Sequence, residues 1–86
     1  MVKKYVKIGE VIHFYTNIEV SVIELVDKIN VGDTIMIKGA TTEFTQPVES
    51  IQIEHKKVDR AEPGDSIGLL VRYRVRKGDE VFREEQ

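Results

Sequence analysis

The side chains able to do chemistry are few in this sequence, and their spacing assembles no catalytic set. His13 and His55 stand far apart, outside the HxH or HExxH spacing of a metal site. Cysteine is absent, which excludes a thiolate nucleophile, a zinc–thiolate site and a disulfide framework. No P-loop, dinucleotide-binding or serine-elbow motif occurs. The sequence therefore predicts a protein that is not an enzyme and that uses no metal and no cofactor.

Arginines at alternate positions form the most distinctive polar pattern. Arg72, Arg74 and Arg76 stand at i, i+2 and i+4, so on one strand they project from the same face about 6–7 Å apart. Guanidinium groups pair phosphate oxygens bidentately, and such a row is able to follow an RNA backbone. The alternative is a solvated face whose arginines pair with acids on neighbouring strands.

A second cationic group is predicted in a loop and consists of Lys56, Lys57 and Arg60. The chain as a whole is slightly acidic, with 13 Lys and Arg against 15 Asp and Glu and a formal net charge of −2. Domains that bind nucleic acid are usually strongly basic, so the net charge favours a protein partner. The two groups together are predicted to contact either RNA or a protein.

Length and composition indicate how these residues are positioned. Eighty-six residues, 41% hydrophobic and 33% charged, suffice for one folded domain spanning 1–86, with a short mobile tail at about 83–86. No stretch approaches the roughly 20 apolar residues of a membrane span, so no membrane association is expected. Together with the absence of cysteine, these features predict a cytoplasmic protein.

Alternation of apolar and polar residues predicts strands along nearly the whole chain. They are expected at 4–15 with a bulge at Gly9, at 18–26, and at 34–38, 43–55, 67–75 and from 80 onward. The period of 18–26 also fits a helix, but its β-branched residues favour a strand with Ile18, Val20, Val22 and Val26 along one apolar face. Gly-Asp turns are expected at 30–33, 62–65 and 77–79. The prediction is an all-β fold, a small closed or nearly closed β-barrel of six to seven strands. Its expected core includes Ile35, Ile37, Ile51, Ile53, Ile67, Leu69, Val71 and Tyr73.

Residues 48–69, VESIQIEHKKVDRAEPGDSIGL, resemble the second domain of translational GTPases of the elongation factor Tu type. That family's barrel carries a V-x-S-I/V-x-x-x-H segment followed by A-x-P-G-D-x-I/V-G. Residues 31–39, 75–81 and 8–11 are similar to its V-G-D-x-I/V-x-I-x-G, V-x-R-G-D/N-x-V and G-x-V segments, so the resemblance covers about 8–82. It implies an elongation factor domain 2-like barrel that contacts the acceptor end of tRNA or the rRNA of the small ribosomal subunit.

The sequence also departs from that family. These 86 residues contain neither the GTPase domain nor the third domain, so the expectation is a free-standing barrel that binds no nucleotide. The predicted function is a non-catalytic, translation elongation factor-like binding protein that contacts RNA or the ribosome. The alternative is a protein–protein interaction module that partners a separately encoded enzyme, since a similar barrel accompanies collagenase-like peptidase family proteins. The identity of the partner and the oligomeric state stay open.

Overall fold

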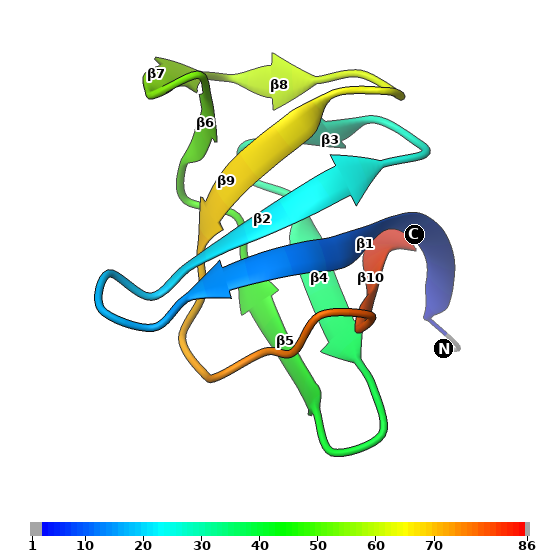
Figure 1. Ribbon diagram of the computed structural model, residues 1–86. Helices are drawn as coiled ribbons and strands as arrows, with labels where there is room; N and C mark the ends of the chain where they lie inside the picture. Colours follow the sequence, from blue (N-terminus) through cyan, green and yellow to red (C-terminus); the bar gives the residue numbers. More distant parts are fainter. Residues whose placement is uncertain (1–2, 86) are drawn as a thin grey trace.

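The computed structural model describes residues 3–85, and its regular structure in that range is entirely β (Figure 1), as the alternation predicted. One antiparallel sheet has the strand order β5-β4-β10-β1-β2-β9-β6-β7, and a smaller sheet pairs β3 with β8. Within residues 3–85, no helix is long and apolar enough to cross a membrane. The strands are β1 (Lys4–Tyr15), β2 (Val20–Leu25), β3 (Ile29–Asn30), β4 (Thr34–Lys38), β5 (Glu43–Pro47), β6 (Ile51–Ile53), β7 (Lys56–Val58), β8 (Arg60–Ala61), β9 (Ser66–Leu70) and β10 (Glu80–Glu85).

The large sheet curls around one core, but it does not close into a barrel (Figure 1). The outermost strands β5 and β7 are not paired with each other in the described part of the chain. The strand pairing therefore does not confirm the predicted closed or nearly closed barrel of six to seven strands. The extra strands β3, β7 and β8 are only two or three residues long, and pairing rather than a long apolar alternation defines them.

A side chain spans the gap beside β5. The amide of Gln46, which is 4% exposed, donates from Nε2 to the carbonyl oxygen of Leu70 at 2.9 Å. Its Oε1 accepts from the backbone N–H of Arg72, also at 2.9 Å. These two bonds satisfy backbone groups that a ladder would otherwise pair. Gln46 thus joins the edge of the sheet to the chain that leaves β9.

The core is built largely from β-branched residues that point inward from the strands. The prediction is right for Ile35, Ile37, Ile51, Ile67, Leu69 and Val71, all at most 3% exposed. Ile53 is partly buried and packs against the core. Tyr73 is wrongly predicted, because it is 62% exposed. The remaining core residues are Ile8, Val11, Ile23, Leu25, Ile29, Val48, Ala61, Val75 and Val81.

The first two strands show how bulges reset the pattern. β1 runs from Lys4 to Tyr15 as predicted, and its pairing with β10 shifts between Lys7 and Gly9, the expected bulge. β2 begins at Val20 rather than at Ile18, because residues 16–19 form a turn. Its inward face is Ser21, Ile23 and Leu25, the opposite of the predicted face, and Val20 and Val22 lie on the outer side.

The arginine segment is not a strand. β9 ends at Leu70, and residues 71–79 form a loop, called the arginine loop below. The N–H of Val71 donates to the carbonyl oxygen of Glu19 at 3.0 Å, and the N–H of Arg72 donates to Oε1 of Gln46. At the other end of the chain, residues 83–85, predicted as part of a mobile tail, continue β10; Gln86 lies outside the described residues.

Three Gly-Asp turns fix the corners of the fold. In each, the Asp N–H donates to the carbonyl oxygen three residues earlier, and the Asp carboxylate accepts from that residue's N–H at 2.8–2.9 Å. The glycine before each Asp has φ between +95° and +99°, a conformation that residues with a Cβ avoid. The three glycines are Gly32, Gly64 and Gly78. The predicted turns are confirmed.

Each turn also holds one buried residue of another segment. The N–H of the turn glycine donates to the carbonyl oxygen of the buried residue. The N–H of the buried residue donates back to the carbonyl oxygen of the turn aspartate, and all these bonds are 2.8–2.9 Å long. The residues held in this way are Val11, Leu25 and Val48, all at most 2% exposed. The flanking sequences do not repeat, yet the same pair of bonds recurs at three corners.

Candidate interaction surface

An apolar row crosses the outer face of three strands. Tyr15 on β1 is paired with Val20 on β2, and Val20 is paired with Leu70 on β9. Directly opposed residues of antiparallel strands project from the same face, so these three side chains lie side by side. Tyr15 and Leu70 are 50% and 59% exposed. We call the row, together with the neighbouring Val22 and Ile18, the apolar patch.

The backbone around the apolar patch is held in place. Ile18, 60% exposed, stands in the β1–β2 turn, and the bond from Val71 to Glu19 ties that turn to the start of the arginine loop. The ring of Tyr15 lies against that of His13 in an edge arrangement with centroids 4.3 Å apart. Adjacent exposed apolar side chains on ordered backbone make this face a candidate interaction surface.

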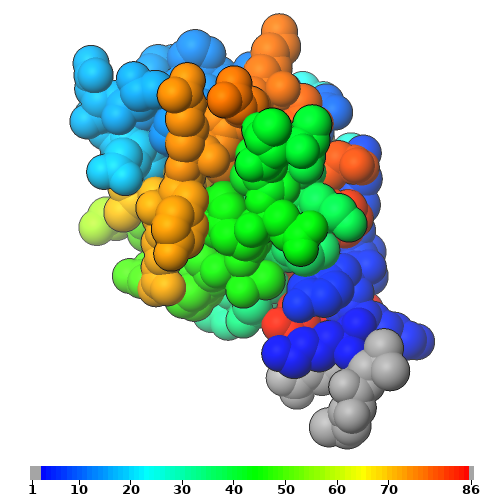
Figure 2. All heavy atoms as spheres, turned by 90° about the horizontal axis from the view of Figure 1, so that it is seen from below, coloured from blue at the N-terminus to red at the C-terminus, as the bar shows by residue number. Residues whose placement is uncertain are grey.

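The arginine loop borders the apolar patch. Figure 2 shows the orange residues of this loop between the light-blue β1–β2 turn and the green β4–β5 segment. Arg72 pairs with Glu49 at 3.2 Å, and the Nε of Arg76 donates to Thr41 Oγ1 at 3.1 Å. Arg74 is exposed, and its neighbour Tyr73 packs edge-on against Phe44 with centroids 5.1 Å apart. The three arginines therefore point to different partners instead of forming one evenly spaced row.

The second predicted cationic group lies elsewhere. Lys56 and Lys57 are on the edge strand β7, and Arg60 on β8 stands 3.7 Å from Glu62. In Figure 1 these strands lie at the top of the molecule and the arginine loop lies below. The structure thus does not bring the six predicted site residues together. The sequence argument also missed Tyr15, Ile18 and Leu70, although the alternation already placed Leu70 on the outward side of its strand.

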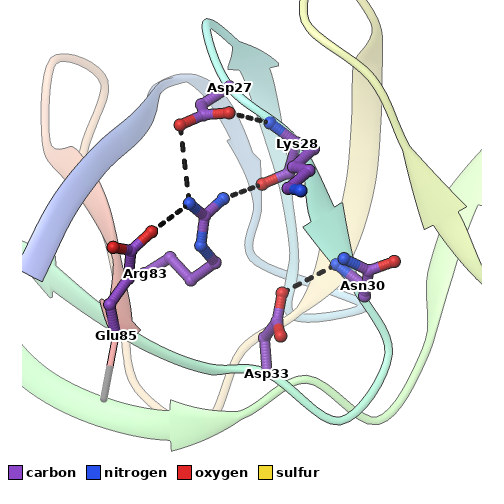
Figure 3. Close-up of polar contacts among 6 residues, drawn as sticks. All are labelled: Asp27, Lys28, Asn30, Asp33, Arg83 and Glu85. Carbon is purple, nitrogen blue, oxygen red and sulfur yellow. Dashed lines mark hydrogen bonds and ion pairs between the residues drawn. The ribbon is translucent and has the colours of Figure 1, made fainter.

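The other polar cluster is structural. Arg83 on β10 is 9% exposed and donates to the Lys28 carbonyl oxygen and to Glu85, each at 2.6 Å (Figure 3). Asp27 lies 3.5 Å from the same guanidinium. The Glu85 hydrogen bond raises the pKa of Arg83, burial opposes the rise, and Asp27 adds to it. The cluster ties β10 to the loop between β2 and β3. Among residues 3–85, no three His, Asp or Glu side chains gather as a metal site.

Comparison with known proteins identifies larger peptidases as relatives of this chain. It is 41% identical over 78 residues to an uncharacterized protease of Methanocaldococcus jannaschii, covering 90% of this chain and 19% of that protein. It is 30% identical over 83 residues to a collagenase of Porphyromonas gingivalis, covering 94% of this chain and 20% of the collagenase. The chain thus spans about a fifth of these curated relatives. No family model matches it.

The solved structures agree on the fold. The C-terminal domain of a Geobacillus thermoleovorans protein assigned to the U32 peptidases superposes with a TM-score of 0.84 at 21% identity, covering 92% of this chain and 91% of that domain. Its selenomethionine variant gives the same TM-score at 19% identity. At these identities the likeness shows that the fold is shared.

These findings correct the predicted family. Elongation factor 1-alpha of Pyrococcus horikoshii is 39% identical over only 49 residues, which is 52% of this chain. The matches to the protease and the collagenase, in contrast, cover nearly the whole chain. The assignment to the second domain of elongation factor Tu-type GTPases is therefore wrong. The predicted role in translation, with RNA or ribosome binding, rested on that assignment and is therefore unsupported.

Proposed function

We propose that this chain is a non-catalytic, protein-binding module that works with a peptidase of the U32 type. Its sequence matches about a fifth of a larger protease and of a collagenase, and its fold matches a C-terminal domain of a U32 peptidase. The module acts beside the rest of such a peptidase, whether both lie in one polypeptide or in two. The alternative left open by the sequence argument was narrower, a module that partners a separately encoded enzyme.

The apolar patch is the observation that carries this proposal. Tyr15, Ile18 and Leu70 are each at least half exposed, yet they stand on paired strands or on a turn bonded to the arginine loop. Their burial by a partner releases water from apolar surface at little cost in backbone ordering, because the backbone is already fixed. Tyrosine in such a patch is typical of residues that dominate binding.

The arginine loop supplies the polar rim of the same surface. Arg72 stands two residues after Leu70, and Arg74 is exposed further along the loop; Arg72 and Arg76 use only part of their donors within the chain. Arginines around an apolar centre pair with carboxylates of a partner and fix its orientation. Lys56, Lys57 and Arg60 stand on β7 and β8, outside the arginine loop, and have no part in the proposal.

Calorimetric titration against a peptidase body tests the proposal. The M. jannaschii protease is prepared without the 78 residues that this chain matches, and the chain is added in trans. We expect a dissociation constant on the order of 1–10 μM, because the tethered module no longer gains effective concentration from its linker. Leu70→Ser should weaken binding at least tenfold, as truncation of a central apolar contact does.

The matched control for Leu70→Ser is Val26→Ser. Val26 is 61% exposed, as Leu70 is 59% exposed, but it follows the opposite end of β2. Val26→Ser should bind like the unchanged chain. The absence of heat and of co-elution at 100 μM of both proteins would refute the proposal, and equal losses in the two variants would remove the apolar patch as its basis.

A further inference from the structure

The apolar patch carries a hollow and a protruding side chain on the same strand. On β9, Gly68 is paired with Val22 of β2 and with Gln52 of β6, and because it has no side chain the surface opens into a hollow of about 250 Å³. Leu70 follows two residues later on the same outer face and is 59% exposed. Liquid water occupies about 30 Å³ per molecule, so the hollow has room for a leucine side chain.

The spacing of Leu70 and Gly68 makes this surface complementary to itself. When two copies stack these faces with their strands running in opposite directions, a two-fold axis lies across the strands, midway between the two positions. Leu70 of each copy then lies over Gly68 of the other, since each residue meets the one at the same distance beyond the axis. An interface between identical chains about a two-fold axis needs such reciprocal contacts. Sheets that pack face to face with strand directions aligned within about 30° are a common arrangement.

The strand pairing gives the neighbouring strands the same relation. The residues opposed to Leu70 and those opposed to Gly68 form two rows across β1, β2 and β9, which lie side by side in Figure 1. The Leu70 row consists of Tyr15, Val20 and Leu70, and the Gly68 row consists of His13, Val22 and Gly68. About the same axis, each row of one copy covers the other row of the second copy. The stack thus removes apolar side chains of three strands from water, which favours association.

Charges of both signs border the apolar patch, and the two-fold axis brings opposite signs together. Ser66, at the start of β9, is paired with Glu24 of β2, and both Ser66 and Glu54 line the hollow. On the other side of the axis, Arg72 is exposed two residues after the end of β9. Because Ser66 and Arg72 are equally far from the axis, Arg72 of one copy meets Glu24 and Glu54 of the other.

The other charged groups at the border also suit a second copy. Lys57, on β7, ends the Gly68 row, whereas Glu49 borders the end of the Leu70 row. These two groups therefore face each other across the axis, and the side chain of Glu49 is 75% exposed although it pairs with its own Arg72. Glu19 and His55 complete the border. A partner with charges of one sign would leave the groups of the same sign unpaired, while a second copy offers both signs.

We infer that two copies of this chain associate face to face through the apolar patch, with Leu70 of each copy seated in the hollow over Gly68 of the other. The inference goes beyond the proposed function, because it concerns the chain when no peptidase body covers the patch. Since one face serves both partners, a peptidase body that binds the patch displaces the second copy.

Sedimentation equilibrium between about 5 μM and about 1 mM should show a rise in mass from one chain to two, with a dissociation constant on the order of 100 μM, as expected of a small interface. Leu70→Ser, which removes the protruding side chain, and Gly68→Val, which fills the hollow, should each weaken association at least tenfold. A Cβ at Gly68 would lie 3.4 Å from Val20 Cγ1, an ordinary contact, so the fold should persist, and the urea unfolding midpoint checks this. Val26→Ser, 61% exposed at the opposite end of β2, is the matched control and should associate like the unchanged chain.

Crosslinking tests the position of the axis. The chain contains no cysteine, so single introduced cysteines report on single contacts. Ser66 and Arg72 are both exposed and meet across the axis. A short bismaleimide, which spans the roughly 10 Å between stacked sheets, should link Ser66→Cys to an isotope-labelled Arg72→Cys, and the mass identifies the mixed pair. Either variant alone should give at most about a tenth of that yield, because identical positions of the two copies lie about 20 Å apart.

Three results would overturn the inference: the mass of one chain at every concentration, equal association of Gly68→Val and the unchanged chain, or Arg72→Cys linking to itself as well as to Ser66→Cys. An excess of the truncated M. jannaschii protease should lower the mixed crosslink, and an undiminished yield with the protease bound would contradict the displacement. The proposed function is judged separately. A chain that stays monomeric and still binds the peptidase body would refute the pair and support the module function.

Discussion

At the scale of single residues, one amide accounts for the way in which the sheet ends. The side chain of Gln46 donates to the carbonyl oxygen of Leu70 and accepts from the N–H of Arg72, as the backbone of a neighbouring strand would. It is 4% exposed, so water does not replace it easily. The chain can therefore leave the ladder after β9 and form the arginine loop without leaving the backbone groups at the seam unpaired.

Gln46→Ala is expected to lower the free energy of unfolding by about 1–2 kcal/mol, because it leaves one part-buried N–H and one part-buried C=O without partners. Gln46→Glu should cost at least as much, since a carboxylate oxygen replaces the donor opposite the Leu70 carbonyl. Urea denaturation measures both. Faster hydrogen exchange at the Arg72 amide in Gln46→Ala is the local sign, and unchanged exchange there would contradict the bridging role.

Arg83 performs a similar task on β10, two strands away in the same sheet. Arg83→Met is expected to cost about 1–3 kcal/mol, since it removes charge-assisted bonds to Lys28 and Glu85. Arg83→Lys should fall between the methionine variant and the unchanged chain, because an ammonium group cannot reach both acceptors with the same geometry. Thermal unfolding ranks the three, and an order with lysine below methionine would contradict this account.

At the scale of elements, the Gly-Asp turns determine where the strands end. Each is held by its own aspartate and in turn holds a buried residue elsewhere in the fold. The turns differ in depth: Asp79 is 5% exposed, whereas Asp65 is only partly buried. The same chemistry should therefore contribute unequally to stability.

Asp79→Ala is expected to cost about 2 kcal/mol and Asp65→Ala about 1 kcal/mol, because an unpaired N–H is more costly where water is excluded. Gly39→Ala should also be destabilising, since a Cβ at Gly39 would collide with the Asp79 carboxylate. Once Asp79 is alanine, Gly39→Ala should cost much less. A double-mutant cycle measures this coupling, and additive losses would show that the two positions act independently.

Sequence patterns predicted these elements where local chemistry decides the structure. Gly64 after Pro63 and before Asp65 gives a turn almost regardless of context, and the long alternation before Tyr15 gives β1. The face of β2 was wrongly predicted because Ser21 is buried in place of a larger apolar residue. Its hydroxyl lacks a hydrogen-bond partner in the described structure, and no sequence pattern marks such a position.

The arginine loop shows the limit of a periodic pattern. Alternation continues from Ile67 to Val75, and both Val71 and Val75 are buried as a strand would have them. The strand nevertheless ends at Leu70, because the next two N–H groups find Glu19 and Gln46 instead of a ladder. Since those partners are distant in the sequence, the position of the arginines could not be predicted from their own segment.

At the scale of the whole molecule, the fold presents an apolar surface at one end and its exposed basic loop beside it. Tyr15 and Leu70 join the apolar patch only through the register of β1, β2 and β9. Each residue alone is an ordinary exposed side chain. The sequence therefore does not indicate the patch, because only the strand pairing brings these residues together. Because larger peptidases contain a matching segment, the rest of such a peptidase is the partner that we propose for this surface.

Footprinting by NMR tests most directly whether the apolar patch is the binding surface. Labelled chain is titrated with the unlabelled M. jannaschii protease that lacks its matching segment, and the backbone amide shifts are followed. We predict that the largest changes and line losses cluster at Tyr15, Ile18, Leu70 and the arginine loop. Shifts clustered instead around Val26 and Val31, at the opposite end of β2, or a spectrum unchanged at saturating protease, would contradict the account.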